Sequence, residues 1–394
     1  MMKLQVPGFV AGAVAAGLKK DGNKDLGMIF SKVSTCAAGV FTTNRVQAAP
    51  VLIDKERIKS GRCQAIIANS GSANACTGKQ GVEDAEAVAR AAAAALGIPE
   101  ELVLVASTGV IGQPLNVSAI EAAMPRLAGQ LSPTGFPDLA RAIMTTDTFP
   151  KTVLKQGSIG DKTFTVVAVA KGAGMILPDM ATMLCFVCTD IGAGPGLLGC
   201  ALKDAVSRSF NTITVDGETS TNDTVLLLAN GLSGLCLKEA ASAAAFQKIL
   251  NEALFTLALQ IVRDGEGATK LVSIHVKGAP NEDDARRVAY TVANSNLVKT
   301  ALFGEDANWG RIMAAIGRSG VPINPEATDI NFGDVCVVKD GQGCGQQAEG
   351  AATRVLKTDR FTITIDLKLG SKAATIHTCD LSTDYVRINA EYRS

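Results

Sequence analysis

Short apolar runs followed by loops rich in glycine and small polar residues recur through the first half of the chain. Such runs predict buried strands that end in turns. The segments concerned are 63–78 (CQAIIANSGSANACTG), 102–112 (LVLVASTGVIG) and 164–190 (FTVVAVAKGAGMILPDMATMLCFVCTD). In the last of them, Pro178 interrupts the pattern just before Thr182, so a strand, a loop and a second strand are predicted.

Longer stretches rich in alanine and leucine alternate with these strands and predict helices. Residues 82–100 (VEDAEAVARAAAAALGIPE) place acidic residues in a first helical turn and Gly97 and Pro99 at the end, which are helix start and stop signals. Residues 197–211 and 240–267 also have helical patterns. This alternation predicts an α/β fold.

The C-terminal part returns to β structure. Residues 361–381 (FTITIDLKLGSKAATIHTCDL) alternate apolar and polar positions around a Gly-Ser turn, which predicts a hairpin with one solvated face. The Gly, Pro and Asp content of residues 276–287 predicts a boundary between two lobes. The patterns together indicate mixed α/β structure with substantial antiparallel sheet.

Length and charge narrow the class of protein. The 394 residues exceed what one hydrophobic core usually serves, so two lobes are expected. Lys plus Arg and Asp plus Glu both number 38, which leaves no charge excess for nucleic acid or an anionic membrane. No apolar run is long enough to span a bilayer, and the start, MMKLQVPGFV, is not a signal peptide. We expect a soluble, cytoplasmic protein.

Cysteine and histidine usage argues against metal or histidine chemistry. Most of the ten cysteines lie in apolar stretches, and the pair Cys185 and Cys188 has no second pair at zinc spacing, so buried thiols are expected. The two histidines, His275 and His377, lie in strand-like alternations. We expect no metal and no cofactor, and any catalysis needs a base other than histidine.

Several loops carry groups suited to ligand binding, although each alone is more often an ordinary turn. Residues 107–112 (STGVIG) join hydroxyls to glycine, where a backbone N–H can approach a ligand closely. Residues 216–224 (DGETSTNDT) could grip a phosphate or a metal, but hydroxyl-rich loops are usually solvated turns. Residues 263–270 (RDGEGATK) end a helix and then offer Glu266 and Lys270.

Thr182 has a chemical option that needs no histidine. A free α-amino group, with a pKa of about 7.7–8.0, can activate a threonine hydroxyl as nucleophile. Thr182 has that amine only if the chain is cut after Ala181, which its own hydroxyl can achieve by attacking the preceding carbonyl. From chemistry alone, a threonine that simply opens a buried strand is the commoner case.

A set of motifs in a fixed order favours Thr182 as a nucleophile over a threonine that simply opens a strand. The motifs are FTTNRVQAAPV, ANSGSANACTG, ASTGVIG, AIMTTDTFPK, AKGAGMILPDMATML, DGETSTNDT, RDGEGATKL, VKTALFGEDANWGRI and DYVRINAEYRS. With them, the chain resembles the ornithine acetyltransferase family, the glutamate N-acetyltransferases of arginine biosynthesis, from near residue 40 to the last residue. Ser72, in the second motif, stands where the family pattern has asparagine.

The resemblance implies a two-lobed, layered αββα fold with mixed and antiparallel sheets, of the self-cleaving N-terminal-threonine type. Cleavage between Ala181 and Thr182 would give an α chain, 1–181, and a β chain, 182–394, with a C-terminal lobe from about 280, assembled as an α2β2 heterotetramer. Thr182 would carry the acetyl group from N2-acetyl-L-ornithine to L-glutamate, and acetyl-CoA would be a second donor.

The resemblance also assigns roles to individual residues. Thr108 and Gly109 would form the oxyanion hole. Substrate contacts are implied for Thr148, Lys171, Thr182, Glu266, Asn389 and Ser394.

Two other classes remain open at this point. An amidohydrolase or aminopeptidase would use the same threonine but hand its acyl group to water. A regulatory binding protein would show neither cleavage nor an acyl-enzyme. The number of matching loops favours the acetyltransferase.

Overall fold

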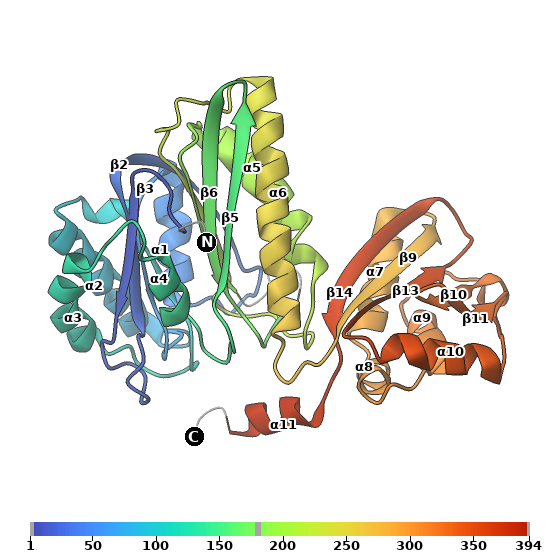
Figure 1. Cartoon of the computed structure of the whole chain (residues 1–394). Coiled ribbons are helices and arrows are strands. Elements are labelled where there is room, and N and C mark those ends of the chain that lie inside the picture. Colours follow the sequence, from blue (N-terminus) through green and yellow to red (C-terminus); the bar gives the residue numbers. More distant parts are fainter. Residues whose placement is uncertain (1–3, 178–182, 392–394) are drawn as a thin grey trace. The chain divides into compact units, whose positions relative to one another are not determined.

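A computed structural model describes residues 4–177 and 183–391 (Figure 1). The chain folds into two compact units. The first contains residues 1–211 and 218–261, and the second contains residues 212–217 and 262–394. The division therefore lies before the expected boundary near 280, because strand β9 (Leu271–Ala279) is part of the second unit's sheet. No helix in the described ranges is long and apolar enough to cross a membrane.

The first unit is built on an eight-stranded sheet with the order β4-β3-β2-β8-β7-β6-β5, and β1 also pairs with β2. Its strands are β1 (Phe9–Val14), β2 (Leu26–Phe41), β3 (Arg62–Asn69), β4 (Val103–Ser107), β5 (Lys151–Ile159), β6 (Lys162–Lys171), β7 (Leu184–Thr189) and β8 (Thr224–Ala229). The strands β3, β4, β6 and β7 lie where the apolar runs predict them. These local predictions are confirmed.

Strand β2 divides this sheet into two layers. Its first part, Leu26–Phe30, pairs with β1 and β3, and its last part, Cys36–Phe41, pairs with β8, with a register shift between Phe30 and Thr35. Apolar residues from β1 to β4 then face residues from β6 to β8 across one core, in which Ile66, Phe186 and Leu226 are almost completely buried. Two β layers are therefore packed face to face.

Helices cover the outer face of each layer (Figure 1). Helices α2 (Gly78–Leu96) and α3 (Val117–Gly129) pack against β3 and β4 through a second core. Helices α5 (Pro195–Ser207) and α6 (Ala240–Arg263) lie on the other side, where Phe246 of α6 contacts Phe164 of β6 at 5.9 Å between ring centres. The expected αββα layering is confirmed, and two shorter helices, α1 (Ala49–Arg57) and α4 (Phe136–Ala142), complete the unit.

The second unit has a six-stranded sheet with the order β12-β11-β10-β13-β9-β14. Besides β9, its strands are β10 (Asp329–Phe332), β11 (Val335–Lys339), β12 (Gln342–Gly343), β13 (Arg360–Asp366) and β14 (Lys372–Cys379). Its helices are α7 (Glu282–Ala293), α8 (Asn296–Phe303), α9 (Trp309–Gly317), α10 (Gln346–Leu356) and α11 (Thr383–Ala390). A core of β9, β13, α7 and α9 residues lies on one face of this sheet.

The hairpin predicted for residues 361–381 is wrong in its pairing. Both strands exist, as β13 and β14, but β9 lies between them, parallel to β13 and antiparallel to β14. The apolar and polar alternation of β13 is nevertheless that of a strand with one buried face. Periodicity reports which face of a strand is buried and does not report which strand lies beside it.

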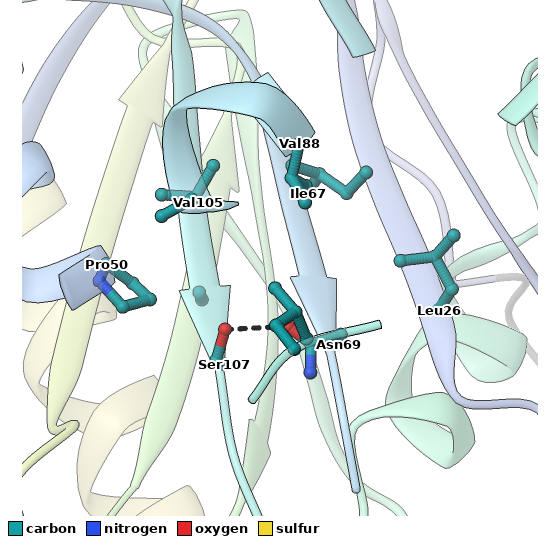
Figure 2. A pocket seen from close by; sticks show the side chains of 10 residues that line it. Leu26, Pro50, Ile67, Asn69, Val88, Val105 and Ser107 are labelled. Atoms are coloured by element: carbon teal, nitrogen blue, oxygen red, sulfur yellow. Dashed lines mark hydrogen bonds between the residues drawn. The ribbon is translucent and has the colours of Figure 1, made fainter. Parts of the chain in front are cut away.

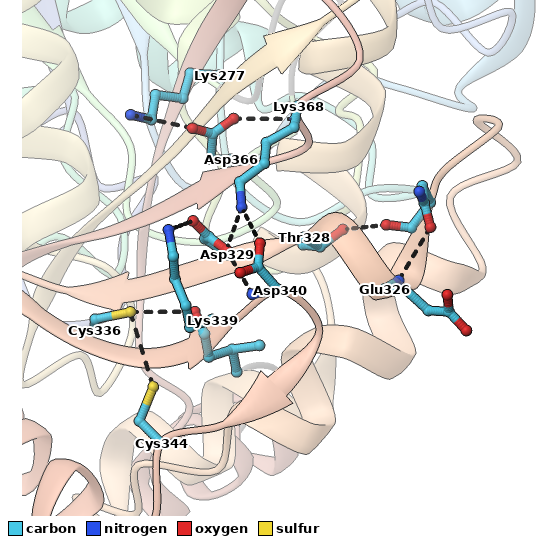
Figure 3. Close-up of polar contacts among 12 residues, drawn as sticks. Lys277, Glu326, Thr328, Asp329, Cys336, Lys339, Asp340, Cys344, Asp366 and Lys368 are labelled. Atoms are coloured by element: carbon cyan, nitrogen blue, oxygen red, sulfur yellow. Dashed lines mark hydrogen bonds and ion pairs between the residues drawn. The ribbon is translucent and has the colours of Figure 1, made fainter.

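Charged side chains join β10, the β11–β12 turn and the segment after β13 (Figure 3). Asp329 accepts from Lys339 at 2.7 Å and from Lys368 at 2.8 Å, and Lys368 also contacts Asp340 at 2.6 Å. Burial alone would raise the pKa of Asp329, but hydrogen bonds from the two lysines outweigh it and lower the pKa to about 2. This network fixes one end of the second sheet.

Candidate active site

Three loops of the first unit meet at the ends of its strands. Residues 70–76 follow β3 and residues 108–112 follow β4, and because these strands are parallel, both loops leave the same edge of the sheet. The loops contact each other through a bridge between Ser72 and Val110. The amide of Asn222, just before β8, donates to the Ala73 carbonyl at 2.6 Å and to the Ser107 carbonyl at 2.8 Å. One buried side chain thus ties the third loop to the other two.

The loop after β4 brings a backbone N–H close to the neighbouring loop. Gly109 has a φ of 132°, and a Cβ atom there would lie 2.4 Å from the carbonyl carbon of Gly71. Only glycine fits this contact and conformation. The Gly109 N–H has no acceptor among residues 4–177 and 183–391, so it can donate to a ligand.

A buried lysine controls the hydroxyl of Thr108. The Lys171 ammonium, at the end of β6, donates to Thr108 Oγ1 and to Thr145 Oγ1, both at 2.9 Å. A hydroxyl has one proton to donate and lone pairs that accept. Because the lysine occupies an acceptor position, the Thr108 proton can point at another acceptor, and the adjacent positive charge strengthens it as a donor. The arrangement suits the stabilisation of a developing oxyanion.

Carboxylate and ammonium groups alternate behind this lysine. Asp147 Oδ1 accepts from Lys151 at 2.6 Å and from the Gly172 N–H at 2.7 Å. Burial alone would raise the pKa of Asp147, but the charges of Lys171 and Lys151 and its hydrogen bonds lower it instead. The ionised carboxylate therefore anchors the loop that begins at Gly172.

The other expected site residues fall into three groups. Thr148 follows Asp147 and is exposed. Ala181, Thr182 and Ser394 lie outside the described residues. In the second unit, Asn389 of α11 donates to Glu266 Oε2 at 2.7 Å, so these two predicted residues are brought together.

A small cavity lies beneath the loops after β3 and β4 (Figure 2). It has a volume of about 10 Å³, and its lining includes Asn69 and Ser107, whose side chains hydrogen-bond at 2.6 Å. This volume is at the lower limit for one water molecule. The strand ends that carry Ser70 and Thr108 are therefore closely packed from behind.

The sequence interpretation missed several residues of this site, namely Asn69, Ser107, Thr145, Asp147, Asn222 and Asp223. The loop that ends at Thr224 was expected to be a solvated turn, but residues 220–224 are all buried. A signal was available for Asn222 and Asp223, since only Thr224 separates them from a run of apolar residues.

Cys185, Cys188 and both histidines lie within strands. Cys185 and Cys188, both buried in β7, face opposite sides of that strand, and burial raises the pKa of each thiol. His275 and His377 hydrogen-bond to Thr375 and Ser273 within the second sheet. Among the described residues, no group of three or more His, Cys, Asp or Glu is placed to hold a metal.

Known proteins match this chain over nearly its whole length. A sequence model of the ArgJ family matches residues 10–394. The arginine biosynthesis bifunctional protein ArgJ of Geobacter sulfurreducens is 50% identical over 393 residues, 99% of this chain and 100% of the relative. The protein of the same name from Syntrophotalea carbinolica is 52% identical over 394 residues, again 99% and 100%.

A solved structure is also similar. The arginine biosynthesis bifunctional protein ArgJ of Bacillus halodurans has a TM-score of 0.50 and 44% identity. The match covers 52% of this chain and 98% of that one. From the family match and the full-length relatives, we conclude that this chain belongs to the ArgJ family.

Proposed function

We propose that this chain transfers the acetyl group of N2-acetyl-L-ornithine to L-glutamate through an acetyl ester on Thr182. We also propose that it makes N-acetylglutamate from acetyl-CoA, since its relatives are named bifunctional proteins of arginine biosynthesis. The observation that carries the proposal is the pair of donors after β4. The Lys171-bonded Thr108 hydroxyl and the Gly109 N–H, which has no acceptor among the described residues, are neighbours in sequence and suit one oxyanion.

The reaction then has two matching halves. The Thr182 hydroxyl attacks the acetamide carbonyl of acetylornithine while the Thr182 α-amine takes its proton and passes it to the departing ornithine nitrogen. Glutamate's α-amine attacks the resulting ester, and the Thr182 oxygen recovers a proton. The same oxyanion donors stabilise the tetrahedral intermediates of both halves of the reaction.

The nucleophile requires a cut before Thr182, so we propose an α chain ending at Ala181 and a β chain beginning at Thr182. The Bacillus halodurans chain supports this, because nearly all of it matches only about half of the present chain. We propose that two copies of each chain assemble as α2β2 in the cytoplasm.

Substrate contacts are proposed for Thr148, Lys171, Glu266, Asn389 and Ser394. The Lys171 ammonium would add positive charge for the α-carboxylate that donor and acceptor share. Thr148 would contribute a hydroxyl, and the hydrogen-bonded pair of Glu266 and Asn389 would meet a substrate amine. Ser394 is proposed as a further contact.

Acetyl transfer with each donor supplied separately tests this function. With acetylornithine, N-acetylglutamate should form only when glutamate is present, and initial rates should give the parallel double-reciprocal lines of a ping-pong reaction. Acetyl-CoA should also support N-acetylglutamate formation. Rapid release of acetate without glutamate would instead indicate a hydrolase, and intersecting lines would indicate direct transfer.

A further inference from the structure

Lys19 is a half-buried lysine beside the loops of the candidate active site. It lies in the connection between β1 and β2, and its neighbour Leu18 packs against Gly71, in the loop after β3. A Cβ atom at Gly71 would lie 2.8 Å from the Leu18 carbonyl oxygen. Because Gly109 packs against the same glycine, the segment with Lys19 and the loop with the proposed oxyanion donors both contact one residue.

A buried aspartate, Asp25, fixes the backbone at Lys19. Asp25 has no exposed surface, and its Oδ2 accepts the N–H groups of Leu18 and Lys19 at 2.6 and 2.9 Å. Its Oδ1 accepts the Ala16 N–H at 2.6 Å. The Asp25 carbonyl accepts the Ser70 N–H at 2.8 Å, so the same residue also holds the loop after β3. The position of Lys19 relative to the site loops is therefore fixed by hydrogen bonds.

The ammonium group of Lys19 reaches the loop after α4. It donates to the Met144 carbonyl at 2.7 Å, and the next residue, Thr145, accepts from Lys171. A lysine ammonium has three N–H donors. Within residues 4–177 and 183–391, the bond to Met144 is its only hydrogen bond, and no carboxylate forms an ion pair with it. Two donors are therefore available to a ligand.

Burial acts on this ammonium more strongly than its charged neighbours do. Burial, the largest effect, lowers the pKa of Lys19, and the negative charges of Asp21, Asp25 and Asp147 offset it only in part. A cation held partly out of water gains more from a bound anion than a cation in bulk solvent does. An anionic ligand therefore suits this position.

We infer that Lys19 binds a carboxylate of the amino-acid substrates, an inference that rests on the function proposed above. Acetylornithine and glutamate share an α-carboxylate, and glutamate carries a second carboxylate in its side chain. Either group would accept the two remaining N–H donors of Lys19 and supply the counter-charge that this ammonium lacks among the described residues.

Lys171 has less capacity for the same contact. It gives two of its three N–H groups to the hydroxyls of Thr108 and Thr145, so at most one further donor could reach a carboxylate. Lys171 then polarises Thr108 and adds positive charge, while Lys19 bonds the carboxylate directly.

The substitution Lys19→Gln removes the charge and keeps an N–H donor for the Met144 carbonyl. Lys24→Gln is the matched control, because Lys24 lies in the same connection but pairs with Asp138 of α4 at 2.9 Å, with both side chains partly exposed. Thermal unfolding checks that each variant is folded. If Lys19→Gln is not folded, Lys19→Met is measured in its place.

Three acceptors reveal which carboxylate Lys19 reads. With acetylornithine as donor, kcat/KM should be measured for L-glutamate, for L-glutamine, whose side-chain carboxylate is an amide, and for L-isoglutamine, whose α-carboxylate is an amide. We expect the wild type to prefer glutamate over one of these amides, and Lys19→Gln to reduce that preference by about 10- to 100-fold, the usual effect of one charged hydrogen bond. Lys24→Gln should keep the wild-type preference.

The ratio between acceptors is a readout that a merely structural role would not move, because a distorted site would slow all three alike. Loss of the preference over isoglutamine would assign the α-carboxylate to Lys19, and loss of the preference over glutamine would assign the side-chain carboxylate. Wild-type preferences over both amides in Lys19→Gln would overturn the inference and leave the proposed function standing. A wild-type enzyme that transfers no acetyl group to glutamate would overturn both.

Discussion

At the scale of single residues, the site depends on how one ammonium group shares its hydrogen bonds. Lys171 donates to two threonine hydroxyls at the same distance, 2.9 Å, but only Thr108 is adjacent to Gly109, whose N–H has no acceptor in the part of the chain that the structure describes. The two threonines therefore differ in position relative to the oxyanion and not in their bond to the lysine. Substituting each in turn separates a direct contact from general support of Lys171.

Thr108→Ala should lower the rate of enzyme acylation by about two to three orders of magnitude, because one oxyanion donor is lost. Thr145→Ala should have a much smaller effect, since it removes a partner of Lys171 and no proposed donor. Rapid-mixing measurements of acetyl-enzyme formation, with thermal unfolding as the control for folding, make the comparison. Equal losses in both variants would show that Thr108 acts only through Lys171.

At the scale of elements, local patterns predicted which segments form strands and helices. They could not predict which strands, distant in sequence, pair with one another. The runs at 63–69 and 184–189 are strands because continuous apolar character needs burial on both faces. The insertion of β9 between β13 and β14 joins segments about ninety or more positions apart, which no local periodicity encodes. The meeting of the loops at Thr108 and Asn222 is non-local in the same way.

Asn222 tests whether the joined loops are needed for activity. Asn222→Ala leaves the buried carbonyls of Ala73 and Ser107 without this donor, at a cost of roughly 1–3 kcal/mol in the free energy of unfolding. Loss of the loop geometry should also lower kcat/KM. Asn230→Ala is the control: its amide bonds to the Pro7 carbonyl at 2.8 Å just after the same strand, at a more exposed position. Urea unfolding and initial rates should separate the two, and similar effects on both measurements would contradict the assignment.

At the scale of the whole molecule, stability should depend on the protonation of a histidine in the second unit. Burial, assisted by the charge of Arg360, lowers the pKa of His377 from 6.5 to about 4. The unfolded chain therefore binds more protons than the folded chain between these values. The free energy of unfolding should be fully present above about pH 6.5 and fall by up to about 3 kcal/mol as the pH approaches 4.

Urea unfolding at a series of pH values measures this dependence. His377→Gln should flatten the profile between about pH 4 and 6.5, whereas His275→Gln should change it less, because His275 is less buried and its pKa is lowered less. A profile unchanged by His377→Gln would show that other groups cause the acid sensitivity.

The central claim is that Thr182 becomes a chain terminus and then carries the acetyl group. Intact-mass measurement of the purified protein after brief exposure to acetylornithine without glutamate tests both parts at once. The account predicts two polypeptides, one ending at Ala181 and one beginning at Thr182, with the second heavier by one acetyl group until glutamate is added. A single uncut polypeptide that forms N-acetylglutamate, or a cut enzyme that is active but never acetylated, would contradict it.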